Sequence, residues 1–230
     1  MKLFTKIIIS TSIACIAAYS LPLYAKPLAG NNLQRKKASL LAHNPTMNKK
    51  ALTLAVRAYE HLREAHKDPQ RLLTFINYAK PSFKKRLWVI NMNTASVIYN
   101  ARVAQGKNTG LVYAKHFSNK PRSLESSLGV FLTGNTYFGE HGKSLRLIGL
   151  EKQFNSNVYR RAVVMHSAWY VNKSFVKKYG RTGRSWGCDA LSTTMAPKVI
   201  KTIKKGTVLV SYYPDKKWIQ HSAYLQPISA

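Results

Sequence analysis

The sequence predicts an α+β protein that is mostly β and is preceded by a short helical N-terminal segment. Residues 45–84 carry apolar side chains at helical spacing. Residues 85–230 carry short runs of strand-like period, separated by glycine and asparagine. A chain of 230 residues is long enough for one domain with a sizeable core.

The N-terminus predicts export from the cytoplasm. Two lysines precede an apolar run over residues 7–18, and Ala25 offers a small residue at a cut site. This pattern is typical of a Sec signal peptide rather than a spanning helix. We therefore expect residues 1–25 to be removed near Ala25, leaving a periplasmic or secreted protein that is soluble after export. An uncleaved membrane anchor and a lipid anchor on Cys15 are the alternatives.

The charge of the chain favours anionic partners. Thirty-seven Lys and Arg residues face 8 Asp and Glu, a formal net charge of +29, and the basic residues are spread along the chain. For an exported protein, the available polyanions are polymers of the cell envelope, which we expect as partners. No RNA-binding aromatic signature or zinc-finger spacing accompanies the charge, so no nucleic acid is expected. Alternatively, the charge only keeps the protein soluble.

The N-terminal third is expected to contain a lead-in and two helices. Residues 26–44 are polar and basic with no clear period, which predicts a loosely attached segment. Residues 45–65 have apolar residues at helical spacing. Asp68 and Pro69 suit the N-cap and first position of a second helix, whose apolar stripe continues to Ala79.

From Arg86 the period becomes strand-like. One late helix is predicted, with Thr193 or Thr194 as its cap, Pro197 in its first turn and Gly206 at its end. The expected strands cover residues 87–92, 96–103, 129–133, 144–150, 161–166 and 207–213.

Cys188 is the candidate nucleophile, because removal of the leader leaves it as the only thiol. We expect it in a loop just before a helix, where the helix N-terminus and the nearby Arg181 and Arg184 favour the thiolate. The backbone N–H groups of Gly187 and Cys188 are candidates for an oxyanion site. Asp189 opposes the thiolate by raising the thiol pKa unless it points away. The alternative is an inert, buried cysteine.

A cysteine nucleophile needs a base, and seven histidines compete for that role. His166 ends an apolar strand, and His141 lies between turn glycines from which it could reach the site. A zinc peptidase built from His141, His166, Cys188 and His221 is an alternative, although the spacing matches no compact zinc motif. We expect no metal and no other cofactor.

Two motifs resemble a known family. His166-Ser167-Ala168, followed by Ser185-Trp186-Gly187-Cys188, resembles the signature of the L,D-transpeptidase catalytic domain of the YkuD type. The resemblance covers roughly residues 85–213 and implies a β-sandwich-like catalytic domain within residues 85–230. Further blocks resemble the murein L,D-transpeptidase branch of this family: residues 127–134, 139–151 and 183–188.

The resemblance implies that peptidoglycan stem peptides are the substrate. Cys188 would form a thioester with the diamino acid and release the terminal D-alanine. An amine of a neighbouring stem would then form a 3→3 cross-link. His166 would act as general base with Ser167 orienting it, while Ser185 and Gly187 would shape the loop and the oxyanion site.

Three further residues, Arg184, Trp186 and His141, are expected to contact the substrate. Trp186 stands where better-known members carry histidine, and Ala190 stands where they carry arginine. These departures leave hydrolysis of the same bond, an L,D-carboxypeptidase activity, as one alternative. A non-catalytic basic protein that binds the cell envelope is another.

Overall fold

The computed structural model describes residues 29–65 and 70–227, so the predicted leader and the predicted Asp68–Pro69 cap lie outside the described residues. Within those ranges, no helix is both long and apolar enough to cross a membrane. The helices and strands, in chain order, are α1 Ala29–His43, α2 Lys49–Glu64, β1 Leu72–Asn77, β2 Leu87–Asn91, β3 Ser96–Ala101, η1 Lys107–Thr109, β4 Gly129–Gly139, β5 Gly142–Gly149, β6 Val164–Ser167, η2 Trp169–Val171, α3 Lys173–Tyr179, β7 Asp189–Leu191, α4 Ala196–Ile203, β8 Val208–Tyr212, α5 Lys216–His221 and η3 Ala223–Leu225.

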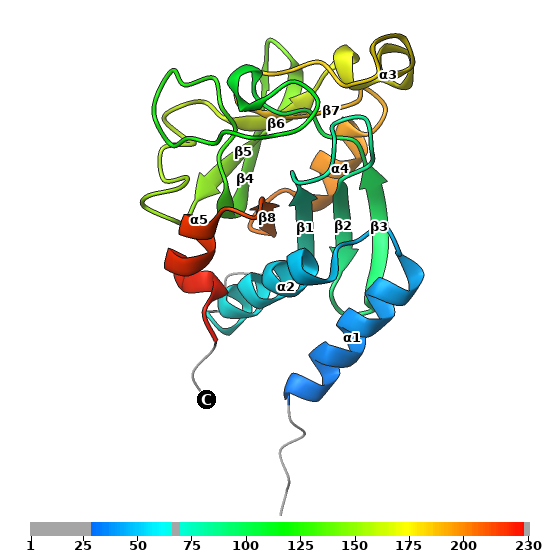
Figure 1. The fold of residues 1–230 in the computed structure, drawn as a ribbon, viewed down its shortest axis with the longest axis vertical. Helices are drawn as coiled ribbons and strands as arrows, with labels where there is room; N and C mark the ends of the chain where they lie inside the picture. The colour runs from blue at the N-terminus through cyan, green and yellow to red at the C-terminus, as the bar shows by residue number, and fades with distance from the viewer. Residues whose placement is uncertain (1–28, 66–69, 228–230) are drawn as a thin grey trace, which may run out of the picture.

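The strands form one sheet in the order β3-β2-β1-β8-β4-β5-β6-β7. Two pairs are parallel, β1 with β8 and β6 with β7, and the other neighbours are antiparallel. The two ends of the sheet meet, because Val103, just beyond β3, bridges Leu191 in β7. The Ala104 N–H also donates to the Ala190 carbonyl at 2.8 Å. The sheet therefore nearly closes on itself, as a barrel does (Figure 1).

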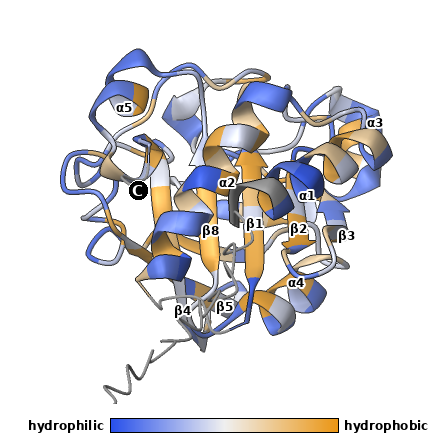
Figure 2. Cartoon of the chain, turned by 90° about the horizontal axis from the view of Figure 1, so that it is seen from below, coloured by the Kyte–Doolittle hydropathy of each residue, from blue (hydrophilic) through white to orange (hydrophobic). Residues whose placement is uncertain are grey.

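The central strands are buried on both faces. Every residue of β1 and β8 is buried. Phe75 belongs to a cluster shared with α1 and α2, while Ile76 belongs to a second cluster that includes Val199 of α4. Figure 2 shows β8, β1 and β2 as strongly hydrophobic segments behind α1 and α2. The core is thus two layers of side chains divided by the sheet.

The predicted α+β class is confirmed, with a mostly β body and a short helical N-terminal segment. The predicted helix over residues 45–65 is α2, and the predicted strands after residue 86 correspond to β2, β3, β4, β5, β6 and β8. The late helix is α4, although its N-cap is Met195 rather than Thr193 or Thr194.

Two predictions for the N-terminal third are wrong. The second helix is strand β1, which pairs with β2 and β8, so residues 72–77 belong to the sheet. An apolar run that is buried on both faces has no period-two signal and is easily mistaken for a helix. The lead-in predicted over residues 26–44 is also ordered from Ala29, because α1 packs Leu40, which is fully buried, against the core.

A buried polar cluster fixes the chain that leads from β5 to β6. The Glu151 carboxylate accepts hydrogen bonds from Val130 N at 2.7 Å and from Trp218 Nε1 at 3.1 Å. Asn155 accepts from Glu151 N at 2.8 Å and donates to the carbonyls of Leu128 and Val130 at 3.0 Å. Because buried polar groups need hydrogen-bond partners, these contacts restrict the conformation of the segment between β5 and β6.

Replacing Asn155 should therefore destabilise the fold. Asn155→Ala leaves buried N–H and carbonyl groups without partners, and we expect a loss of about 2–3 kcal/mol in the free energy of unfolding, measured by urea denaturation. Gln153→Ala, at an exposed position two residues away, is the control and should change stability by less than about 0.5 kcal/mol. Equal effects of the two substitutions would contradict the role assigned to Asn155.

Candidate active site

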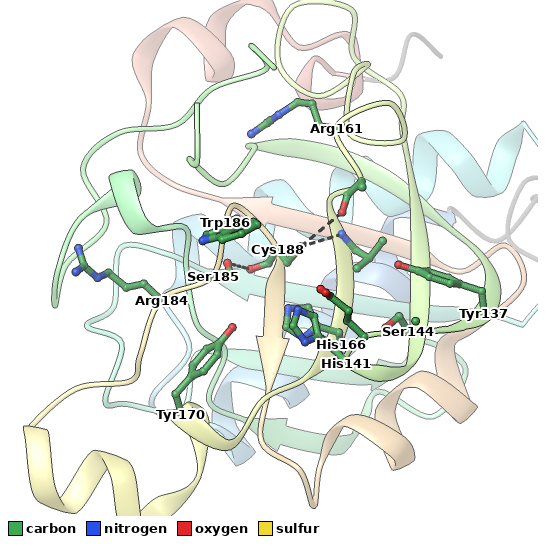
Figure 3. Close-up of a pocket in the computed structure, with 14 residues that line it drawn as sticks. Tyr137, His141, Ser144, Arg161, His166, Tyr170, Arg184, Ser185, Trp186 and Cys188 are labelled. Carbon is green, nitrogen blue, oxygen red and sulfur yellow. Dashed lines mark hydrogen bonds between the residues drawn. The ribbon is translucent and has the colours of Figure 1, made fainter. Parts of the chain in front are cut away.

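A pocket of about 440 Å³ opens beside β6 and the loop before β7 (Figure 3). Neither Ser167 nor Gly187 lines it, although each is adjacent to a residue that does. The predicted site residues that line the pocket are His141, His166, Arg184, Ser185, Trp186 and Cys188.

Cys188 lies immediately before strand β7 and is half-buried. The prediction that it precedes a helix is wrong, so no helix N-terminus acts on the sulfur. Its Sγ accepts from Val164 N at 3.5 Å and donates to the Ala162 carbonyl, 3.6 Å away. Both contacts come from the end of the segment that enters β6, and they hold the thiol against the pocket wall.

The Cys188 thiol is neutral at neutral pH, contrary to the thiolate expected from the sequence. Burial raises its pKa to about 11, and Asp189 also raises it, whereas the Val164 N–H and Arg161 lower it. Burial has the largest effect on this pKa. The free energy lost when a thiolate is removed from water exceeds the stabilisation that the weak Val164 N–H contact and the partly engaged Arg161 cation provide. Ionisation of the sulfur therefore requires a base that acts during the attack.

His166 is the candidate for that base. It is 1 % exposed on strand β6, and its Nδ1 lies 2.9 Å from the Ser167 carbonyl. A carbonyl oxygen only accepts, so Nδ1 carries the proton and Nε2 is the basic nitrogen. Burial lowers the pKa of His166, the Ser167 carbonyl raises it, and His141 lowers it further. The imidazole is therefore neutral at neutral pH.

The pairing of β6 with β7 puts the base and the thiol on one face. Met165 pairs with Asp189, so Cys188 stands opposite Val164. Val164 and His166 are two residues apart and project from the same face of the strand. His166 and Cys188 are therefore diagonal neighbours on the face that lines the pocket (Figure 3).

His141 covers the imidazole of His166. It lies at the tip of the β4–β5 hairpin, and its ring stacks on that of His166 with centroids 4.2 Å apart and an interplanar angle of 22°. This contact accounts for part of the burial of His166. His141 also lowers the pKa of His166, in the same direction as burial.

The side chain of Ser185 holds the conformation of the loop before Cys188. Ser185 Oγ donates to the Cys188 carbonyl at 2.7 Å and accepts from Gly187 N at 3.2 Å. Gly187 has φ +122°, and a Cβ there would come within 2.8 Å of the Glu125 carbonyl. Glycine is thus required at this position, and its N–H is already bonded in this conformation.

The other two predicted contact residues lie at the rim. Trp186 is 78 % exposed. Arg184 Nη1 donates to the Lys107 carbonyl at 2.9 Å, and Figure 3 shows its guanidinium directed away from Cys188.

The sequence interpretation missed Arg161 and Tyr170, which also line the pocket. Arg161 donates to the Ser118 and Glu125 carbonyls at 2.5 and 2.6 Å, so it fixes the loop that passes over Gly187. Burial and, to a smaller extent, Cys188 together raise the pKa of Tyr170 to about 12. Arg161 lies in an irregular segment with no motif, and Tyr170 stands just beyond the His166-Ser167-Ala168 motif in η2, where nothing in the sequence marks it as a pocket residue.

Asp189 points away from the pocket into a buried polar cluster. Its Oδ1 accepts from Tyr78 Oη at 2.5 Å. The guanidinium of Arg86, which is fully buried, lies over the Tyr78 ring at 4.8 Å from its centroid. Burial raises the pKa of Asp189 to about 6, whereas the Tyr78 hydroxyl and Arg86 lower it. The carboxyl is therefore mostly ionised at neutral pH and partnered in the core.

The four residues of the zinc alternative do not converge. His221 lies on α5 and lines another pocket, together with Glu151 and Tyr224. Among the described residues, no group of three or more His, Cys, Asp or Glu side chains is arranged to hold a metal ion.

Several solved structures resemble the chain. An L,D-transpeptidase from Mycobacterium smegmatis shares 15% identity, with 62% of this chain and 59% of that one covered and a TM-score of 0.38. An L,D-transpeptidase from Stackebrandtia nassauensis shares 12% identity over 80% of this chain and 91% of that one, with a TM-score of 0.35. The helical cell shape determining protein Pgp2 from Campylobacter jejuni shares 10% identity over 70% and 56%, with a TM-score of 0.42.

The family is assigned by a different comparison, since structural similarities this low carry no assignment. No curated protein matches the chain. A family model described as L,D-transpeptidase catalytic domain matches residues 43–212, which include all eight predicted site residues. Because this match spans most of the sequence, the chain belongs to the L,D-transpeptidase catalytic domain family.

Proposed function

We propose that this protein is a peptidoglycan L,D-transpeptidase that works through a thioester on Cys188. The observation that carries the proposal is that the Cys188 thiol and the His166 imidazole line one pocket, with Nδ1 of the imidazole bonded to the Ser167 carbonyl so that Nε2 is the basic nitrogen. Such a pair exchanges its proton as the sulfur attacks, which suits acyl transfer without a metal or other cofactor.

The acylation half of the reaction uses His166 twice. The Cys188 sulfur attacks the carbonyl of the diamino acid in a stem peptide, and its proton moves to His166 Nε2. The tetrahedral intermediate then collapses, the C–N bond to D-alanine breaks, and the same proton passes to the leaving amine. The product is a thioester and free D-alanine.

The second half reverses these proton movements. A side-chain amine of a neighbouring stem attacks the thioester carbonyl and gives a proton to His166. The C–S bond breaks, the proton returns to sulfur, and a 3→3 cross-link is formed. Water in place of the amine would give hydrolysis, so the two activities differ only in the acceptor.

The remaining pocket residues take supporting roles in this proposal. Ser185 and Gly187 shape the loop beside the oxyanion site, in which Gly187 N must exchange Ser185 for the substrate oxygen. Arg184 and Trp186, at the rim, meet the substrate, and His141 forms the wall on the side of the hairpin.

We also propose that the protein acts outside the cytoplasm. Peptidoglycan lies there, and residues 1–25 have the composition of a cleavable leader. The excess of 37 basic over 8 acidic side chains suits a wall whose stem peptides and associated polymers carry negative charge.

The thioester proposal predicts a covalent adduct on Cys188. Incubation with purified disaccharide-tetrapeptide should release D-alanine and leave the acyl group on Cys188, detected by mass spectrometry of the intact protein and its peptides. Cys188→Ala should lose both, whereas Gln153→Ala, on the surface, should keep both. Release of D-alanine by Cys188→Ala would rule out the thioester. Mass spectrometry of the products formed with an added acceptor stem then distinguishes cross-linking from hydrolysis.

The raised pKa of Cys188 predicts slow alkylation of the free enzyme. With a pKa of about 11, on the order of 1 thiol in 10⁴ is ionised at pH 7, so the rate of modification by iodoacetamide should climb steadily with pH up to about 11. The rate is measured by mass spectrometry against N-acetylcysteine. A rate that levels off below pH 8 would instead mean a preformed thiolate.

The stacked histidines predict a shift in the titration of His166. His141→Ala removes the electrostatic effect by which His141 lowers the pKa of His166 and opens that imidazole to water, and both changes should raise the pKa of His166 toward its ordinary value of 6.5. NMR titration of the ring protons measures this shift directly. Since His166 acts only when neutral, the acid limb of D-alanine release should move to higher pH. An acid limb that stays in place or moves down would contradict the stack.

A further inference from the structure

The short helix α3 contributes no side chain to the core. It covers Lys173–Tyr179, and none of its residues is buried. Figure 1 shows it at the edge of the molecule, beyond β7 and away from the helices that cover the sheet. A surface helix ordinarily buries one face against the body of the protein. The residues of α3 are therefore not part of the buried core.

Three aromatic rings on α3 and the preceding η2 contact one another at the surface. Trp169 is 67 % exposed and Tyr179 is 50 % exposed. Phe175, which is half-buried, lies between these two exposed rings, with its ring centroid 5.5 Å from that of Trp169 and 4.5 Å from that of Tyr179. We call these three residues the aromatic ridge. An exposed, contiguous apolar surface of this kind marks a binding site more often than a single exposed ring does.

The aromatic ridge continues into the active-site pocket. Tyr170 lines the pocket and makes an edge contact with Trp169, with centroids 6.0 Å apart. Gly183 allows Tyr170 this place, because a Cβ at Gly183 would overlap the Tyr170 ring. A ligand that leaves the pocket past Tyr170 meets the aromatic ridge next.

The stretch of chain that carries the aromatic ridge is basic and has no acidic residue. Residues 152–188 contain no Asp or Glu. Lys173, Lys177 and Lys178 are all exposed on α3, and Lys178 Nζ lies over the Tyr179 ring at 5.3 Å from its centroid. Flat rings stack on the C–H faces of sugars, and ammonium groups pair with carboxylates. Together they suit a carbohydrate chain that bears carboxylates.

We propose that the aromatic ridge is a subsite for the glycan strand of peptidoglycan, and this inference rests on the proposed function. Sugar rings stack on Trp169 and Tyr179, while the lysines of α3 pair with carboxylates of neighbouring stem peptides. The stem is short: three extended residues span about 10 Å, so a diamino acid held at Cys188 keeps its sugar close to the protein surface. The enzyme thus recognises the glycan as well as the peptide.

The test compares two substrates and one insoluble ligand. Trp169→Ala/Tyr179→Ala should lower the ratio of kcat/KM for disaccharide-tetrapeptide over free tetrapeptide by about tenfold, because only the first substrate carries sugar. Co-sedimentation with purified sacculi, done in a Cys188→Ala background, should weaken by a similar factor. Tyr113→Ala, which removes a 54 % exposed ring outside the pocket, is the matched control and should change neither quantity.

Each outcome bears on a different claim. An unchanged substrate ratio with unchanged sacculus binding overturns the glycan subsite. Loss of binding to phosphatidylglycerol vesicles, with sacculus binding retained, also overturns it and makes the aromatic ridge a membrane surface. If no variant, including the wild type, releases D-alanine, but sacculus binding still depends on Trp169 and Tyr179, then the proposed catalytic function fails while the subsite stands.

Discussion

The buried guanidinium of Arg86 is the constraint on which the rest of the site depends. A fully buried charge is tolerated only when it is paired and hydrogen-bonded. Arg86 meets this need by donating to the Val103 carbonyl at 2.9 Å and to Gln105 Oε1 at 2.8 Å, and by facing Tyr78 and Asp189. Val103 follows β3 at one end of the sheet, and Asp189 belongs to β7 at the other end. Because Asp189 directly follows Cys188, the contacts around this one buried charge help to close the sheet and to fix the position of Cys188.

The same local forces explain why a strongly basic protein carries a neutral thiol. Solvent screens the many exposed lysines, so a net charge of +29 contributes little at a half-buried sulfur. Arg161, the cation that lowers the pKa of the thiol, donates its hydrogen bonds to the loop over residues 118–127. Desolvation therefore decides the protonation state of the thiol, and the proposed mechanism assigns the proton transfer to His166, whose own burial lowers its pKa. The burial of Cys188 and His166 is consistent with the proposed mechanism, in which the proton moves from sulfur to imidazole during the attack.

Sequence reasoning succeeded where a single pattern decides the structure, and it failed where tertiary contacts decide. The amphipathic helix α2 and the hairpin of β2 and β3 have clear periods, and the motifs around His166 and Cys188 are local. Strand β1 is apolar on both faces and mimics a helix. Strand β7 has only three residues, Asp189–Leu191, which is too short for any period, so Cys188 was expected before a helix. Arg161 reaches the pocket from an irregular segment that no motif marks.

The site thus separates into a buried part that sets the chemistry and an exposed part that is free to set recognition. Asp189 and His166 are 4 % and 1 % exposed, so replacing either disturbs packing or leaves polar groups unpaired. Replacing Trp186 or the residues of α3 should not disturb the core, because none of these side chains is buried in it. Under the proposed function, substitutions at the rim can therefore change which polymer is bound while the thiol, the imidazole and the fold stay as they are. Tryptophan at position 186, where better-known relatives carry histidine, is the kind of change that this division permits.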